Sequence, residues 1–187
     1  FESAGYNPLG WLDDKNNRIG VYIGASFHDY QHVVSESNTD DRFLPFTSQT
    51  YSYANRISYF FNLRGPSVVL DTACSSSLVA IAEACNSLVL ETSDLAIAGG
   101  VCVIPGPSLH IMTSKAGMLS ADGRCFTFDN RADGFVVGEG VGVIALKRLS
   151  DAQKDKDNIY GIICGWGINQ DGKTNGITAP NQDSQIR

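Results

Sequence analysis

The 187-residue sequence has no excess of basic side chains, no long apolar run and no closely spaced pair of cysteines. Its 14 lysines and arginines face 20 aspartates and glutamates, for a net charge of -6. A basic stripe that could neutralise phosphates is therefore missing, and nucleic acid is not an expected partner. No stretch approaches the about 18 apolar residues that span a bilayer, and the N-terminus lacks a basic region followed by an apolar one. The composition predicts neither membrane insertion nor secretion.

The five cysteines form an odd number and include no C-x-x-C pair. A disulfide framework is normally denser in a short secreted chain, and a zinc site normally has closely spaced ligand pairs. The spacing therefore predicts reduced thiols in a cytoplasmic protein without a zinc site. We also expect no metal and no bound cofactor. The cysteines are Cys74, Cys85, Cys102, Cys125 and Cys164.

What is present is enough apolar material for one core, arranged in alternating strand and helix patterns. Short runs rich in β-branched residues predict strands at 18–25, 67–73, 94–103, 141–146 and 159–168. Helical spacing predicts helices at 48–63 and 78–89, and the second is apolar nearly all round, so we expect it to be buried on most sides. The polar stretch 28–46 indicates an exposed loop or a frayed helix. Strands separated by a buried helix predict mixed α/β layers.

Cys74 stands in DTACSSSL, between a predicted buried strand and the first turn of a predicted buried helix. Free amides and the positive end of the helix dipole favour a thiolate there, and the same amides could stabilise an oxyanion. We expect the neighbouring serines to satisfy the unpaired helix amides. The geometry is similar to a nucleophile elbow. Spacing alone leaves open that Cys74 is an ordinary small core residue at a strand end.

Four separated motifs carry a family resemblance: ANRISYFFNLRGPS, DTACSSSLVA, KAGMLSADGRCFTFDNRADGFVVGEGVGVIALKRL and GINQDGKTNGITAPN. In this order they resemble the ketosynthase (β-ketoacyl synthase) domains of type I polyketide synthases over essentially the whole chain. The sequence departs from the family pattern at Phe126, where a basic or polar residue is usual, and at Trp166, where a small one is common. Both departures affect the expected packing of loops and leave the expected chemistry unchanged.

The resemblance implies a thiolase-like layered α/β/α fold, with 1–187 as mainly the N-terminal half of a domain cut at both ends. It implies that Cys74 accepts an acyl group from the phosphopantetheine arm of an acyl carrier protein. Decarboxylative condensation with a malonyl-type extender thioester then follows in the intact domain, which forms a homodimer. The segment 106–119, with Ile111, Met112 and Met118, is expected to help wall the acyl pocket, although packing in the core is an alternative for these three.

Other candidate residues have structural explanations. His28, His32 and His110 lie in contexts unlike the family's two catalytic histidine motifs, which are expected after Arg187, so we interpret all three as bystanders. Three carboxylates in FDNRADGFVVGEG are spaced by four and six residues, but turn capping and pairing with Arg124 or Arg131 is the stronger interpretation. The glycines there precede a strand, which argues against a nucleotide site. The carboxylates are Asp129, Asp133 and Glu139.

Two further functions stay open at this point. One is the same chemistry in an animal-type fatty acid synthase. The stretch KTNGITAP favours a polyketide synthase over this alternative. The other is a non-catalytic relative that only scaffolds a dimer or sets chain length. Cys74 argues against the scaffold, because such relatives typically lack the nucleophile. Two histidine motifs beyond Arg187 would favour catalysis, and their loss would favour the scaffold.

Overall fold

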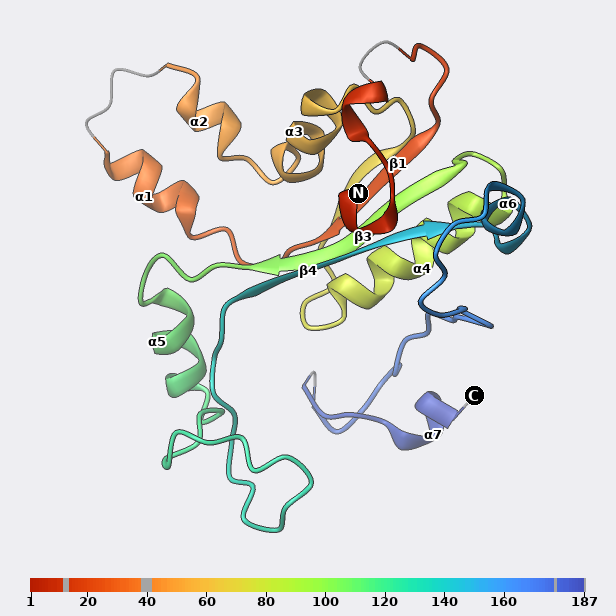
Figure 1. The fold of residues 1–187 in the computed structure, drawn as a ribbon. Helices are drawn as coiled ribbons and strands as arrows, with labels where there is room; N and C mark the ends of the chain where they lie inside the picture. Colours follow the sequence, from red (N-terminus) through yellow and green to blue (C-terminus); the bar gives the residue numbers. More distant parts are fainter. Residues whose placement is uncertain (12–13, 38–41, 177, 187) are drawn as a thin grey trace.

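The structure is a computed structural model that describes residues 1–11, 14–37, 42–176 and 178–186. Helices and strands alternate along most of the chain (Figure 1). The strands are β1 (Ile19–Gly24), β2 (Ser67–Leu70), β3 (Leu95–Cys102) and β4 (Gly140–Lys147). The helices are η1 (Glu2–Ala4), η2 (Pro8–Trp11), α1 (Tyr30–Glu36), α2 (Leu44–Thr47), α3 (Ser52–Phe60), α4 (Ser76–Val89), α5 (Ser108–Lys115), α6 (Leu149–Asp155) and α7 (Gln182–Ile186).

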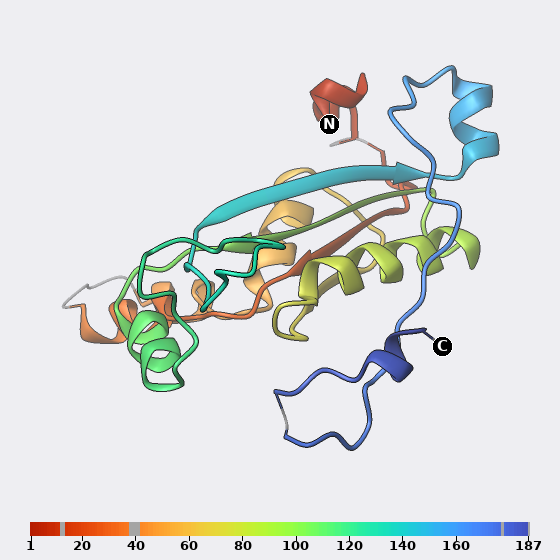
Figure 2. The same ribbon diagram turned by 90° about the horizontal axis from the view of Figure 1, so that it is seen from below.

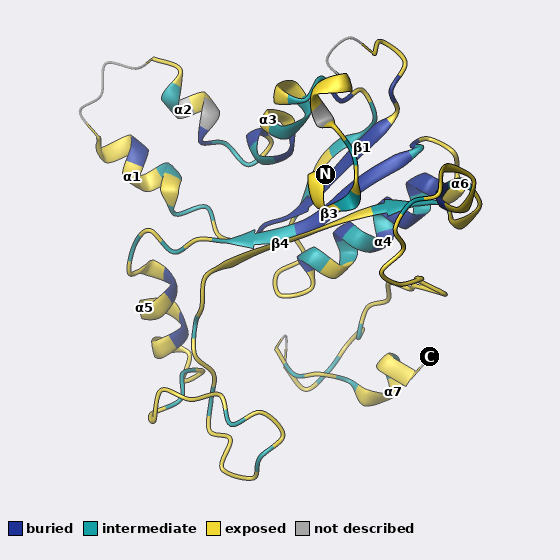
Figure 3. Ribbon diagram, viewed as in Figure 1, coloured by how far each residue is buried: buried dark blue, intermediate teal, exposed yellow. Residues whose placement is uncertain are grey.

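The strands form one sheet in the order β2-β1-β3-β4. β1 pairs in parallel with β2 and with β3, and β4 runs antiparallel to β3. Every residue of β1 is buried, as is the first part of β3, which agrees with their unbroken apolar sequences (Figure 3). The strands predicted at 18–25, 94–103 and 141–146 are confirmed.

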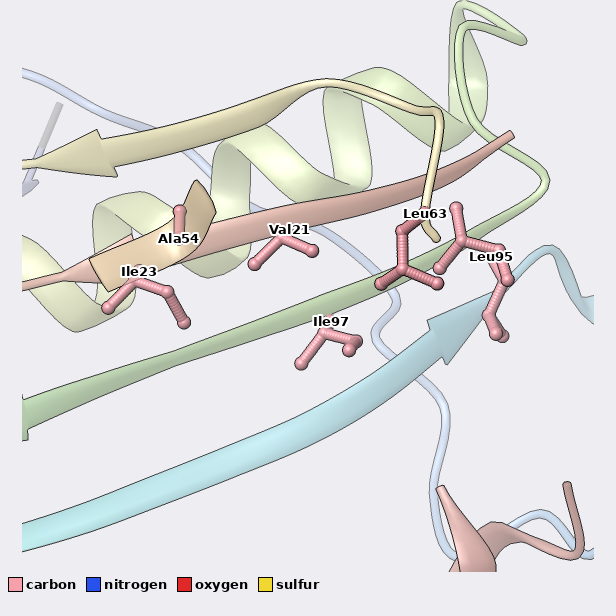
Figure 4. Packing of buried hydrophobic residues seen from close by; sticks show 7 residues of the cluster. Val21, Ile23, Ala54, Leu63, Leu95 and Ile97 are labelled. Carbon is pink, nitrogen blue, oxygen red and sulfur yellow. The ribbon is translucent and has the colours of Figure 1, made fainter. Parts of the chain in front are cut away.

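Alternate side chains of β1 and β3 supply two cores, one on each face of the sheet. On one face Val21, Ile23 and Ile97 pack with Ala54 of α3 (Figure 4). On the other face Tyr22 packs with the small residues of α4, which runs along the sheet (Figure 2). This alternation is the period-2 pattern of strands that are covered on both faces. The layered α/β/α arrangement is therefore confirmed.

The helix predicted at 78–89 exists as α4, and the expectation that it is buried on most sides is confirmed: within α4 only Leu78 and Val89 are exposed. Its buried side is made of small residues such as Ala80 and Ala84, which allow close packing on the sheet. Leu78 and Val89 point away from the sheet and are 70% and 65% exposed. An apolar face of this kind is typical of a surface that contacts another segment or protein.

β2 is shorter than the predicted strand 67–73 and lies at the edge of the sheet rather than at its centre. In the described part of the chain β2 pairs with β1 alone, so its side chains are only partly covered. A strand forms over 67–70, but the expectation that 67–73 is a buried strand is therefore wrong. Val69 nevertheless packs against the core that β1 and α3 form, whereas Val68 on the opposite side is exposed.

Replacing Val69 with aspartate is expected to lower the free energy of unfolding by about 3 kcal/mol, because an unpaired carboxylate would enter an apolar cluster. Val68→Asp is the matched control: it places the same residue in the same strand on the exposed side, and should cost about 1 kcal/mol or less. Urea unfolding of the two variants measures the difference. Equal midpoints for both variants would contradict this assignment of faces.

The strand predicted at 159–168 is wrong. Residues 158–170 are exposed throughout and pair with no described strand, and an apolar run becomes a strand only where a neighbour accepts its backbone hydrogen bonds. The run instead extends away from β4 and passes α4 (Figure 1). The polar stretch 28–46 contains two short helices, α1 and α2, on either side of residues outside the described ranges. The helix predicted at 48–63 is confirmed as α3, with narrower bounds.

An arginine holds the C-terminal end of α4. The guanidinium of Arg148 donates to the carbonyls of Leu88 at 3.0 Å and Ser93 at 2.8 Å, and to Asp94 at 2.8 Å. Arg18 also binds Asp94, with its Nη2 atom 2.7 Å from Oδ1. Hydrogen bonds from Arg18 and then Arg148 lower the pKa of Asp94. Because this end of α4 is anchored to β3, the opposite end of the helix is held in a defined place over the sheet.

Candidate active site

The candidate site lies where the carboxyl ends of parallel strands meet. β1, β2 and β3 run in the same direction, so the segments that follow them leave from one edge of the sheet. Residues 71–75 connect β2 to α4, and this connection carries Cys74, which is exposed. Ligands of open α/β sheets bind at this edge. The structure thus places Cys74 at a strand-to-helix junction, as the sequence predicts, and it is not a buried core residue.

A tight turn presents Cys74. The amide of Ser76 donates to the carbonyl of Ala73 at 3.1 Å, so Cys74 and Ser75 are the central residues of a β-turn. Ser75 has φ -90° and ψ -2°, the values of the third residue of a type I turn. Ala73 has φ 55°, in the left-handed region that non-glycine residues rarely adopt. Such a conformation persists only where the surroundings hold it.

Two serine hydroxyls surround the carbonyl of this left-handed residue. Ser76 Oγ lies 2.6 Å from Ala73 O, and Ser26 Oγ lies 2.9 Å from the same atom. The two hydroxyls are 2.9 Å apart, and Ser76 Oγ also accepts the amide of Thr72 at 2.9 Å. Ser76 is 4% exposed, so these bonds form almost out of contact with water. Sequence reasoning missed Ser26, because its relation to the turn exists only through the parallel pairing of β1 with β2.

The expectation that the serines after Cys74 satisfy the unpaired amides of the helix is wrong for the capping residue. Ser75 is the N-cap of α4, but it makes no side-chain cap hydrogen bond. Its hydroxyl donates instead to the carbonyl of Thr72 at 2.8 Å. Both Ser75 and Ser76 therefore point back to the turn, because the left-handed Ala73 brings the carbonyls of the turn within reach of their side chains.

Two glycines let the start of α4 lie directly on the sheet. A Cβ atom at Gly24, the last residue of β1, would lie 2.5 Å from backbone atoms of Ser76 and Ser77. A Cβ atom at Gly100 in β3 would lie 2.7 Å from the Cβ of Ser77. Real Cβ atoms do not approach other atoms this closely, so both positions require glycine. The two glycines therefore fix the height of the turn above the sheet.

The other thiols differ from Cys74 in position. All five cysteines are free; Cys85 is buried in α4, and burial raises the pKa of its thiol. Cys125 is exposed in the loop before β4, where its sulfur accepts the amide of Val136 at 3.3 Å. Cys164 is exposed in the extended C-terminal segment. Of these, Cys74 is the thiol at a strand-to-helix junction.

Of the three histidines, His28 lies beside the turn. Its Nε2 atom is 3.8 Å from Asp71 Oδ2, and Tyr53 OH is 3.4 Å from its Nδ1. Asp71 in turn accepts the amide of Ala73 at 3.0 Å. His32 and His110 are exposed on α1 and α5. The nearness of His28 follows from the β1–β2 pairing and had no signal in its own sequence context.

The proposed pocket residues do not pack in the core. Ile111 and Met112 on α5 are about half exposed, and Met118 follows the helix in an exposed turn. The core side of α5 is formed by Leu109 and Thr113. Core packing, the alternative for the three residues, is therefore wrong. They lie on the part of the chain that projects beyond the end of β3 (Figure 1), and their role in a pocket stays a prediction.

Of the three carboxylates before β4, Asp129 has the predicted arginine partner, whereas Asp133 and Glu139 accept backbone amides. Asp129 binds Arg131 with both oxygens, at 3.0 and 2.7 Å, which lowers the pKa of Asp129. Glu139 accepts the amide of Ile104 at 2.5 Å and joins the ends of β3 and β4. The oxygen of Asp133 lies 3.4 Å from the amide of Ala121. Among the described residues no cluster of three or more histidines, cysteines or acids is arranged to hold a metal ion.

The two departures from the family pattern also have contacts. The Phe126 ring lies beneath the guanidinium of Arg131, 4.7 Å from its centroid. The indole of Trp166 donates to Asn86 of α4 at 2.8 Å, which attaches the C-terminal segment to that helix. In the described ranges no helix is both long and apolar enough to cross a membrane.

A layered sheet with a cysteine turn between an edge strand and a helix packed on the sheet is consistent with the thiolase-like fold that the family resemblance implies. Residues 1–152 match the family described as "Beta-ketoacyl synthase, N-terminal domain". The chain belongs to the β-ketoacyl synthase family.

Similar proteins agree with this assignment. The chain is 48% identical to "Polyketide synthase PksL" of Bacillus subtilis over 187 residues, which cover 100% of the chain and 4% of that protein. It is 48% identical to a phenolphthiocerol/phthiocerol polyketide synthase of Mycobacterium tuberculosis, covering 99% of the chain and 12% of that protein. The chain thus spans a small part of these relatives.

Solved structures show the same fold. The "Ketosynthase from module 6 of the bacillaene synthase" of Bacillus subtilis 168 superposes with a TM-score of 0.86 at 46% identity, covering 99% of this chain and 30% of that one. An oxazolomycin ketosynthase domain of Streptomyces albus gives 0.87 at 35% identity, covering 98% and 31%. The thiolase-like fold predicted from the resemblance is confirmed.

Proposed function

We propose that this chain carries the acyl-accepting cysteine of a ketosynthase that elongates polyketide chains. The observation that carries the proposal is the exposure of Cys74 on a constrained turn between β2 and α4, in a member of the β-ketoacyl synthase family. Cys74 directly precedes Ser75, the N-cap of α4, and the free amides at a helix N-terminus can stabilise the oxyanion that forms on a thioester carbonyl. Membership of the β-ketoacyl synthase family favours a catalytic ketosynthase over a non-catalytic scaffold. The similar proteins are polyketide synthases, which favours polyketide synthesis over fatty acid synthesis.

In the first step the Cys74 thiolate attacks the carbonyl carbon of an acyl thioester. The new carbon–sulfur bond to Cys74 forms as the bond to the phosphopantetheine sulfur breaks, and the departing thiolate takes up the proton that Cys74 lost. We assign the delivery of this acyl group to an acyl carrier protein, whose phosphopantetheine arm is the only cofactor the reaction uses.

In the second step a malonyl-type thioester loses carbon dioxide, and its enolate carbon attacks the acyl carbon on Cys74. A carbon–carbon bond forms, the sulfur of Cys74 leaves as thiolate, and a β-ketoacyl thioester is released on the carrier. The developing enolate needs hydrogen-bond donors that are preorganised for it. The resemblance assigns this role to histidines outside 1–187.

The residues Ile111, Met112 and Met118 are proposed to contact the acyl chain, because they expose apolar side chains on and after α5. We further propose a homodimer, for which the unpaired side of β2 in the described sheet offers an edge. A cytoplasmic location fits the five free thiols, since a reducing compartment maintains that state.

Cys74 is expected to be the most reactive thiol of the protein. Limited iodoacetamide labelling near neutral pH, read by peptide mass spectrometry, should modify Cys74 about tenfold faster than Cys125 or Cys164, since these lie at no helix N-terminus. Incubation with an acyl thioester should place the acyl group on Cys74. The variant Cys74→Ala should lose this loading, and Cys125→Ala should keep it. Faster labelling of Cys125 or Cys164, or loading that survives Cys74→Ala, would contradict the assignment.

A further inference from the structure

We infer that Ser76 and Ser26 are positioning residues, which set the direction of Cys74 by holding the carbonyl of Ala73. This inference rests on the proposed function, since it concerns the acylation of Cys74. The two serines come from separate segments: Ser76 begins α4, and Ser26 follows β1 by two residues. Both hydroxyls are within 2.9 Å of the same carbonyl oxygen.

The two serine hydroxyls together have enough protons to keep the Ala73 carbonyl hydrogen-bonded. Two hydroxyl protons serve three contacts: Ser76 with Ala73 O, Ser26 with Ala73 O, and Ser26 with Ser76. Whichever hydroxyl donates to the other, at least one proton is left for Ala73 O. The carbonyl therefore always accepts a hydroxyl hydrogen bond, in addition to the bond from the Ser76 amide at 3.1 Å.

Ser76 also acts on the residue before Ala73. Its Oγ accepts the amide of Thr72 at 2.9 Å, so one hydroxyl binds both the amide that precedes the left-handed residue and the carbonyl that follows it. An alanine with φ 55° returns to negative φ when nothing holds it, and this rotation would swing the next residue, Cys74. Because Ser76 is buried, water cannot replace its hydroxyl without opening the packing on Gly24.

The test is the acylation of Cys74 by an acyl thioester under single-turnover conditions in the intact protein. Ser76→Ala should lower the rate at saturating thioester about tenfold and leave the half-saturating concentration unchanged, because a misdirected sulfur slows attack and not binding. Ser26→Ala should lower the rate about threefold, and Ser26→Thr, which keeps the hydroxyl, should restore it. Ser150→Ala is the control: Ser150 is also in the first turn of a helix, α6, but is exposed.

The outcomes separate this inference from the proposed function. If the unaltered protein does not load an acyl group on Cys74, the proposed function fails. If it loads and the Ser76→Ala and Ser26→Ala variants load at the same rate, the positioning role is overturned. A rise in the half-saturating concentration at an unchanged maximal rate would also overturn it. Should Ser76→Ala fail to fold, the comparison of Ser26→Ala with Ser26→Thr decides, since Ser26 is only half-buried.

Discussion

Replacing Gly24 with alanine is expected to lower the free energy of unfolding by about 4 kcal/mol or more and to abolish the selective labelling of Cys74. The added Cβ would lie 2.5 Å from the backbone of Ser76 and Ser77 and 2.6 Å from the carbonyl oxygen of Ser76. Side chains can rotate away from an overpacked atom, but these are backbone atoms. The start of α4 must therefore lift from the sheet, and the turn that presents Cys74 must move with it.

Gly142→Ala is the matched control for this change. Gly142 also lies in a strand of the same sheet, and its φ angle is not positive, but no atom lies within 4 Å of a Cβ built there. The loss of backbone entropy in the unfolded state is the same for both substitutions, so only the contact with α4 differs. Urea unfolding gives the stability and iodoacetamide labelling gives the reactivity. A Gly24→Ala protein that matches Gly142→Ala in both would show that α4 does not depend on this close approach.

The elements of the central fold could be predicted because their signal is local. The runs that form β1 and β3 are apolar without a break, and the small residues of α4 recur at helical spacing. The sequence predictions fail where a strand depends on which other strands lie beside it in the fold. β2 has an apolar sequence that is typical of a central strand but lies at an edge, and 159–168 has a strand sequence without a strand beside it. A local pattern contains no information on which strands are adjacent.

At the site, too, residues with a local sequence signal could be predicted, and residues that only the fold brings together could not. Cys74 could be identified from the junction of strand and helix patterns and from the motif around it. Ser26, His28 and Gly24 could not, because each follows or ends β1, about 50 residues before Cys74 in the sequence. They reach the turn only because β1 and β2 are parallel and end at the same edge of the sheet. Residues of this kind have no sequence signal other than the strand that precedes them.

The 187 residues by themselves are expected to accept an acyl group on Cys74 but to release no carbon dioxide from a malonyl thioester. Decarboxylation needs donors aimed at the enolate oxygen as charge develops. His32 and His110 are exposed on α1 and α5. His28 is nearer to the turn, but Asp71 lies 3.8 Å from one ring nitrogen and Tyr53 OH lies 3.4 Å from the other, so both nitrogens face protein groups.

The assay supplies the chain with acyl-carrier and malonyl-carrier substrates and follows carbon dioxide and β-ketoacyl product. Loading of Cys74 without either product is the expected result, and it is also the internal control that the chain is folded and its thiol active. Sustained turnover would mean that the groups for decarboxylation lie within 1–187. His28→Ala then identifies the error: if the variant still loads Cys74 but no longer releases carbon dioxide, His28 is a catalytic residue and its interpretation as a bystander is wrong.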